Sequence, residues 1–289
     1  MLLYCATLLS RLPLKVHYGF ADWLLFPLMY YVVRYRRKIV DKNLCIAFPD
    51  KTDSERARIA RDFYHQFCDT LVEIIYGFGC PDEEMMQRTG FEGMEEANRL
   101  FDEAGGGIVM MAHLGNWEWL FTTPQCLSPG MTQLTVYRRL KNKAVEKLMQ
   151  TVRGKRGTVC VEKKQTFRIA EQYSLTRRPF VFFLASDQKP RPDARQERLI
   201  FLHRETGFFT GGETLGKKYG FPVIYLHVNR VQRGYYKVKV QLITTDPRST
   251  AEGEITRTYA RLLEENIQEQ PELWLWSHNR FKTAKKNKE

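Results

Sequence analysis

Short runs of apolar residues, each the length of a buried strand, alternate along this chain with segments of helical spacing. The apolar runs cover residues 108–112, 134–137, 179–185 and 222–228. Runs of this length and composition are typical of strands in the interior of a sheet. Their alternation with helices favours an α/β fold with a mixed, largely parallel central sheet that is flanked by helices.

The helical segments are predicted from apolar side chains that recur every three or four positions. Residues 53–76 have this spacing, and Thr52 or Asp53 is suited to be the N-cap. Further elements are expected later in the chain. Residues 117–125 can begin a helix, and helices are expected at 142–153 and 212–219. A strand is expected at 235–244, and a closing helix at 252–270 ends before Pro271.

The length of 289 residues and the hydrophobic content of 43% are sufficient for a large buried core. The sequence contains neither an internal repeat nor a Ser- or Gly-rich linker. We therefore expect an N-terminal helical segment at residues 1–40, associated with a membrane, and one domain at residues 41–289.

The N-terminal segment is apolar but interrupted by charges. Residues 1–10 are uncharged, and Arg11, Lys15 and Asp22 precede a second apolar run at residues 23–33. Neither run reaches the roughly 18 apolar residues of a membrane-spanning helix. An interfacial or re-entrant pair of helices is favoured, and an ordinary buried core helix is the alternative.

Aromatic and basic side chains in this segment are suited to a membrane surface. Trp23, Tyr30 and Tyr31 are expected at the level of the lipid headgroups. A basic cluster follows, which would meet anionic lipid and keep the main domain on the cytoplasmic side: Arg34, Arg36, Arg37 and Lys38.

The net charge of +12 favours partners that carry phosphate, which include anionic lipids, nucleic acids and acidic carrier proteins. The charge is concentrated at residues 138–178, where thirteen Lys or Arg residues are accompanied by three Glu. The alternative for this stretch is a lysine-rich helix surface in contact with solvent.

Six widely separated cysteines form no CxxC pair, and no histidine has zinc-like spacing to other ligands. We therefore expect no metal site, no disulfide framework and a reducing cytosolic environment.

The motif His113-Leu-Gly-Asn-Trp-Glu118 places a carboxylate five positions after a histidine. On one regular helix these side chains would lie about 140° apart. They can meet if His113 lies in a strand-to-helix turn, which Gly115 and Asn116 permit, and Glu118 lies in the first helical turn. The carboxylate would then orient the imidazole, which would deprotonate a hydroxyl. The alternative is a hydrogen-bonded core histidine.

The motifs in their order resemble those of the lipid A late acyltransferases, the lauroyl or myristoyl transferases with an HxxxxD/E signature. The resemblance covers nearly the whole chain. It is carried by Asn43-Leu44 with Phe48-Pro49, HLGNWE at 113–118, YRRLKN at 137–142, Asp187-Gln188, Thr210-Gly211-Gly212, PELWLW at 271–276 and RFK at 280–282.

The resemblance implies transfer of a fatty acyl chain from acyl carrier protein or coenzyme A to a hydroxyl of an acyl chain on a phosphorylated glycolipid, a lipid A precursor. It implies no cofactor, because the acyl thioester is a substrate. His113 corresponds to the general base and Glu118 to its orienting carboxylate. The implied location is the cytoplasmic face of the bacterial inner membrane.

Three further residues are expected to bind substrate: Arg138, Asp187 and Asn116. Arg138 would hold a phosphate or stabilise an oxyanion, with an exposed surface arginine as the alternative. Asp187 follows a buried strand, where α/β folds place functional groups, and a helix N-cap is its alternative. For Trp274, Trp276 and Phe281 core packing is favoured. The other histidines, His278 included, are expected to be structural or surface groups.

The sequence leaves other functions open. The same chemistry could act on an aminolipid, a glycerolipid or a mannosylated phospholipid. A nucleic-acid-binding module would explain the basic stretch, but no RRM, KH or helix-turn-helix pattern accompanies it. A non-catalytic membrane scaffold is disfavoured by the intact HxxxxE motif.

Overall fold

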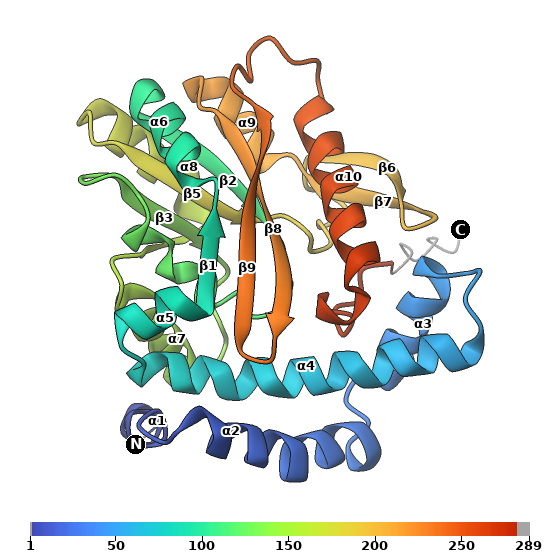
Figure 1. Ribbon diagram of the computed structural model, residues 1–289. Helices are drawn as coiled ribbons and strands as arrows, with labels where there is room; N and C mark the ends of the chain where they lie inside the picture. Colours follow the sequence, from blue (N-terminus) through green and yellow to red (C-terminus); the bar gives the residue numbers. More distant parts are fainter. Residues whose placement is uncertain (1, 282–289) are drawn as a thin grey trace.

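A mixed sheet of seven strands forms the centre of the computed structural model, which describes residues 2–281 (Figure 1). The strand order is β1-β9-β8-β2-β5-β3-β4, and all neighbours are parallel except β8 and β9. The predicted α/β class is thereby confirmed. The strands are β1 (Thr89–Glu92), β2 (Gly106–Met111), β3 (Thr132–Tyr137), β4 (Val159–Glu162), β5 (Phe180–Ala185), β8 (Val223–Gln232) and β9 (Tyr235–Thr244).

The predicted strands were found because their apolar runs are buried in the middle of the sheet. Every residue of β2 is buried, as are all residues of β5 except Ala185. β8 continues beyond the predicted strand because it pairs with β9 through a hairpin, in which Gly234 adopts a positive φ of 76°. A separate antiparallel hairpin of β6 (Gln196–Phe201) and β7 (Arg204–Phe209) was not predicted.

Helices cover the sheet and confirm most of the predicted segments. α4 (Asp53–Gly79) begins with a complete capping box between Thr52 and Glu55. The segment expected as a helix from residue 117 is instead a short 3-10 helix, η3 (Trp119–Gln125), because Pro124 cannot continue an α-helix. The other helices that follow the N-terminal segment are α3 (Arg37–Ala47), α5 (Asp82–Arg88), α6 (Met94–Ala104), α7 (Lys143–Gly154), α8 (Thr166–Leu175), α9 (Gly211–Tyr219), α10 (Glu254–Glu269), η4 (Lys163–Gln165) and η5 (Pro271–Leu273).

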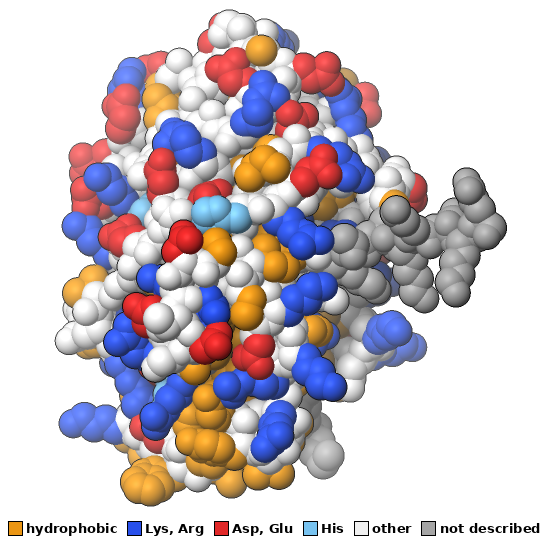
Figure 2. Space-filling model, turned by 90° about the vertical axis from the view of Figure 1, so that its right-hand side faces the viewer, with side chains coloured by type: hydrophobic (Ala, Val, Ile, Leu, Met, Phe, Trp, Pro, Cys, Tyr) orange, Lys and Arg blue, Asp and Glu red, His pale blue; other side chains and the backbone are white. Residues whose placement is uncertain are grey.

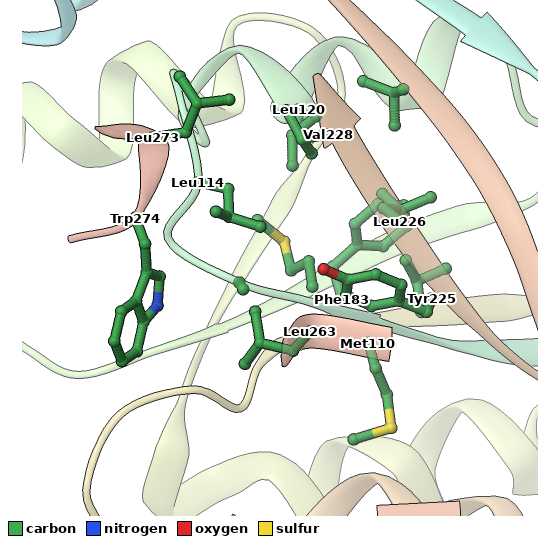
Figure 3. Close-up of a cluster of buried hydrophobic side chains, with 14 of the residues drawn as sticks. Met110, Leu114, Leu120, Phe183, Tyr225, Leu226, Val228, Leu263, Leu273 and Trp274 are labelled. Carbon is green, nitrogen blue, oxygen red and sulfur yellow. The ribbon is translucent and has the colours of Figure 1, made fainter. Parts of the chain in front are cut away.

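The hydrophobic core joins the sheet to the helices and to the C-terminal segment. Figure 3 shows Met110 of β2 and Tyr225 of β8 near Leu263 of α10, and all of these side chains are buried. In the same cluster Leu114 lies near Trp274, with which it forms an isolated β-bridge. The C-terminal segment thus packs directly on the loop that follows β2.

The N-terminal helices lie along α4, on the side away from the sheet (Figure 1). α1 (Leu2–Leu9) precedes α2 (Leu14–Phe20), which continues in the π-helical turns η1 (Ala21–Leu25) and η2 (Leu28–Val32). Among residues 2–281, no helix has both the length and the apolar composition needed to cross a membrane.

Two polar contacts fasten this segment to the domain. Arg233, in the turn between β8 and β9, binds Asp22 at 2.7 and 2.8 Å and also pairs with Asp69 of α4. The Tyr18 hydroxyl donates to buried Glu73 of α4 at 2.8 Å. The N-terminal helices are therefore joined to the domain by directional bonds as well as by apolar packing.

Candidate active site

The register between β2 and β5 brings two predicted site residues together. Met111 is the partner of Ala185 in this parallel pair, and His113 and Asp187 each follow two residues later. Because parallel strands end at the same edge of a sheet, the two side chains meet there. Asp187 Oδ1 lies 2.7 Å from His113 Nδ1, and Oδ2 accepts the His113 backbone N–H at 3.1 Å.

Asp187 is buried, with 3% of its side chain exposed, and has a third donor in the Trp274 indole N–H at 3.0 Å. Burial alone raises the pKa of Asp187, but the adjacent imidazole and these hydrogen bonds outweigh it and lower the pKa. All of these partners favour the ionised carboxylate. Asp187 is therefore a fixed negative charge beside His113, and it is not the cap of a helix.

The pKa of His113 is raised, whereas that of Asp187 is lowered. Burial is the largest single effect and lowers the pKa of His113, but the charge and hydrogen bond of Asp187, together with the charge of Glu118, outweigh it, and the pKa lies above the ordinary value of 6.5. The imidazole keeps 17% of its side chain exposed. A hydrogen bond from Nδ1 to Asp187 leaves the lone pair of neutral His113 on Nε2. That lone pair faces the amide nitrogen of Gln188, 3.2 Å away.

The carboxylate of Glu118 has a different partner from the predicted one. Arg153 of α7 donates two hydrogen bonds to it, from Nη2 to Oε1 at 2.6 Å and from Nε to Oε2 at 2.9 Å. The Trp117 indole also donates to Oε1, at 3.2 Å. In place of the expected bond to Glu118, the imidazole donates to Asp187. The reason is geometric, since the paired strand places Asp187 directly beside the ring.

Asn116 points into the interior rather than toward solvent. Its amide donates to Glu73 at 2.9 Å, and the same carboxylate accepts the hydroxyls of Tyr18 and Tyr236 at 2.8 and 2.9 Å. Burial raises the pKa of Glu73 against the effect of these hydrogen bonds. A direct contact of Asn116 with substrate would require the exchange of this buried bond. The motif asparagine joins the loop after β2 to α4 and, through Glu73, to Tyr18 of the N-terminal helices.

Arg138 is exposed and follows β3, which pairs in parallel with β5. It therefore lies at the same edge of the sheet as His113 and Asp187. In the basic stretch 138–178 some charges are internal, because Arg153 is paired with Glu118 and Arg156 with Asp82 at 2.9 Å. Only part of the stretch is available to an anionic partner.

The C-terminal segment closes over the loop after β2. Gly115 donates its backbone N–H to Leu273 at 2.9 Å, and Leu275 donates to the carbonyl of His113 at 3.1 Å. The expected burial of Trp274, Trp276 and Phe281 is confirmed. Trp274 has an additional role as a donor to Asp187, which the sequence did not indicate.

The site contains the components of proton transfer to and from a hydroxyl or thiol. In the described part of the chain, no group of three His, Cys, Asp or Glu side chains is arranged to hold a metal ion. A carboxylate-oriented imidazole with a lone pair on Nε2, at the carboxyl ends of two parallel strands, defines an α/β protein suited to general-base group transfer.

The comparisons specify the group that is transferred. The family described as bacterial lipid A biosynthesis acyltransferase matches residues 4–283, so the chain belongs to this family of acyltransferases. A palmitoleoyltransferase of lipid A biosynthesis from Escherichia coli (strain K12) is 23% identical over 250 residues, which cover 86% of this chain and 79% of the relative. A lipid A biosynthesis acyltransferase from Shigella flexneri has the same identity and coverage.

Proposed function

We propose that this enzyme transfers a fatty acyl chain from an acyl thioester, on acyl carrier protein or coenzyme A, to a hydroxyl of a lipid A precursor. The observation that carries the proposal is the 2.7 Å contact between His113 Nδ1 and Asp187, which leaves Nε2 as the base. Family membership supports the acyl group and the lipid acceptor. No cofactor is required, because the thioester supplies the activated acyl group.

In the proposed reaction, His113 Nε2 removes the proton of the acceptor hydroxyl while the oxygen bonds to the thioester carbonyl carbon. The carbon–sulfur bond then breaks, and the imidazolium returns the proton to the departing sulfur. Asp187 stabilises the imidazolium between these steps. Base catalysis of this kind contributes about 10²- to 10⁴-fold to the rate.

Gln188 has a defined place in this proposal. Its side-chain amide donates to the lone pair of His113 Nε2 at 3.2 Å. The acceptor hydroxyl must therefore displace this amide in order to reach the same lone pair. The displaced amide N–H would then be available to the oxyanion that forms at the thioester carbonyl. Arg138 is proposed to hold a phosphate of the acceptor, because an exposed guanidinium is suited to two-pronged phosphate binding.

Glu118 is proposed to act through the loop that carries the base. Arg153 holds its carboxylate at one end of the HLGNWE segment, and Asn116 is held by Glu73 in the middle. His113 at the other end is held by Asp187. The motif carboxylate would therefore be needed for the geometry of the loop even though another carboxylate contacts the ring.

Residues 1–40 are proposed to hold the enzyme on the cytoplasmic face of the bacterial inner membrane, next to the acyltransferase domain at 41–289. Trp23 is 87% exposed, and Phe20, Leu24 and Val32 on the same helices are exposed as well. Figure 2 shows hydrophobic side chains gathered at this end of the molecule with Lys and Arg around them. Apolar side chains that insert between headgroups, with cations beside anionic lipid, are typical of interfacial helices.

The proposal is tested by mass spectrometry of lipids from cells that lack the protein, complemented with the wild-type chain or with His113→Ala. We expect lipid A one acyl chain short, restored by the wild type alone. Loss of an acyl group from another lipid would retain the chemistry and replace the acceptor. An unchanged lipid composition would contradict the proposed function.

A further inference from the structure

Three successive residues after β5 each contact a ring nitrogen of a histidine. Asp187 binds Nδ1 of His113 at 2.7 Å, and Gln188 faces Nε2 of the same ring at 3.2 Å. The third residue, Lys189, donates its backbone N–H to Nε2 of His278 at 3.1 Å. One short turn, residues 187–189, thus carries both ring partners of the proposed base and ends on a second histidine.

His278 is itself held firmly by the N-terminal half of the chain. Asn43 of α3 donates its side-chain amide to the carbonyls of Trp276 and His278, both at 2.8 Å. Arg36 donates to the carbonyl of Ser277 at 3.0 Å. The imidazole of His278 therefore links the turn 187–189 to a segment that is fixed from another side.

The bond from Lys189 requires an unprotonated Nε2, because a protonated imidazole has no acceptor. Burial lowers the pKa of His278 to about 4, against the attraction of Asp187 and with the repulsion of Arg280. The other charges that act on this ring are His113 and Arg36, which lower its pKa further. His278 is neutral, and hence an acceptor, throughout the physiological range of pH.

We infer that His278 is a positioning residue of the acyltransferase, which holds the turn 187–189 so that Asp187 and Gln188 face the two ring nitrogens of His113. This inference rests on the proposed function, because it assigns His278 a role in the orientation of the proposed base. Its effect on the reaction passes through residues 187–189 and requires no contact between His278 and substrate.

The geometry makes this role sensitive to small displacements. Asp187 Oδ1 is at hydrogen-bond distance from Nδ1, and a misplacement of about 1 Å in a catalytic group costs about 100-fold in rate. Removal of the acceptor at His278 releases one end of the turn. Productive orientation of His113 would then be lost in part, although the substrate site itself is unchanged.

The test compares His278→Leu, which has no acceptor, with His278→Gln, whose side-chain oxygen can replace Nε2. The assay uses a lipid A precursor and acyl carrier protein loaded with a panel of fatty acids. We expect His278→Leu to lower kcat about 10- to 100-fold with little change in KM, and His278→Gln to restore most of the loss. The acid limb of the pH–rate profile should move to lower pH in His278→Leu, because the contact between Asp187 and His113 weakens.

His227→Leu is the matched control. His227 also accepts or donates one side-chain bond through Nε2, but its partner is Glu269 of α10 at 2.8 Å. This variant should retain the wild-type kcat and pH profile. If His278→Leu does not fold, His278→Asn replaces it, because the shorter amide does not reach Lys189.

Several outcomes would overturn the inference. His278→Leu could have the wild-type kcat and pH profile, or it could lower the Tm alone with turnover per folded molecule unchanged. Equal losses in the Leu and Gln variants would also contradict a role as acceptor. A wild-type enzyme without acyltransferase activity would contradict the proposed function, whereas an active wild type with an equally active His278→Leu contradicts only the inference.

Discussion

The guanidinium of Arg153 binds both carboxylate oxygens of Glu118, at 2.6 Å from Nη2 to Oε1 and 2.9 Å from Nε to Oε2. Both side chains are largely buried. The pair joins α7 to the loop after β2, so the carboxylate of the HLGNWE motif holds the loop that carries His113. The two acidic residues of the site thus have different roles: Asp187 orients the ring of His113, and Glu118 fixes the backbone of the loop.

Removal of Arg153 alone should therefore be more harmful than removal of both partners. Arg153→Met leaves the Glu118 carboxylate buried without its cation, and the loss of one member of such a pair costs about 3–5 kcal/mol. The double variant Arg153→Met with Glu118→Gln should recover part of this loss, because no uncompensated charge remains. Urea denaturation of the single and double variants gives the coupling free energy.

Arg99 provides the control for this experiment. It pairs with Glu96 and Glu103 on the exposed surface of α6, where solvent screens the charges. Arg99→Met should leave the Tm nearly unchanged. An Arg153→Met variant as stable as Arg99→Met, or a double variant that shows no recovery, would contradict the role of the buried pair.

Replacement of Asp187 by Asn should change both the rate and its pH dependence. Burial lowers the pKa of His113, but Asp187 and, to a smaller extent, Glu118 together outweigh it, so the wild-type pKa lies above 6.5 and the base form is lost as the pH falls through that raised value. Without the carboxylate the pKa of His113 falls, and the acid limb of kcat/KM moves to lower pH. The rate itself should fall about 10²- to 10⁴-fold, because tautomer and ring orientation are lost.

Glu118→Gln is the comparison variant for this prediction. Glu118 also raises the pKa of His113, but Asp187 has the larger effect. The acid limb should thus move less in Glu118→Gln than in Asp187→Asn. The reverse order would show that Glu118 is the partner of the ring in the working enzyme.

The raised pKa of Glu73 should make its contribution to stability decrease with rising pH, whereas the contribution of most carboxylates increases. Burial raises its pKa in the folded protein, so the native state binds more protons than the unfolded state above the ordinary pKa of 4.5. This contribution to stability is present below 4.5 and is lost as the pH rises toward the raised value. Glu73→Gln should flatten that part of the curve of unfolding free energy against pH. A slope equal to that of the wild type would contradict the prediction.

The central strands could be predicted because burial on both faces leaves a continuous apolar run, as in β2 and β5. The edge strands β1 and β4 were missed because each has four residues and both are only partly buried. In β6 and β7 charged residues interrupt the apolar ones, so neither strand contains a continuous apolar run. Its pairing depends on contacts that a local pattern does not contain.

The site was predictable to the extent that it is local. The HxxxxE motif predicts His113 as the base, and it predicts Glu118 as the partner of the ring because Glu118 is near in sequence. The actual neighbour, Asp187, is 74 positions away and is brought in by the register of β2 with β5. A predicted parallel pair would have provided a signal, since each residue follows its strand by the same number of positions. The bond that Trp274 donates to Asp187 and the bond that His278 accepts from Lys189 depend on the path of the C-terminal segment, which no motif specifies.

The exposed apolar face of the N-terminal helices predicts binding to anionic vesicles. Trp23→Glu should weaken that binding, because loss of one inserted side chain costs about 1.5–3 kcal/mol, or about 10- to 150-fold in affinity. Leu175→Glu is the matched control, because Leu175 is 80% exposed but lies on α8. Vesicle sedimentation should show wild-type binding for the control and weaker binding at high salt for every chain, since salt screens Arg34 and Lys38 from the lipid.

The turnover of Trp23→Glu distinguishes attachment from folding. With an acceptor dispersed in detergent, this variant should retain the wild-type kcat, because Trp23 does not contribute to the bonds that hold His113. With the acceptor in vesicles, its rate should fall together with its binding. Equal binding by Trp23→Glu and the wild type would place the membrane contact on another surface. Loss of activity in detergent as well would instead show that the N-terminal segment is needed for the geometry of the site. Tyr18 of this segment is connected to the loop that carries His113 by hydrogen bonds to Glu73, which also binds Asn116.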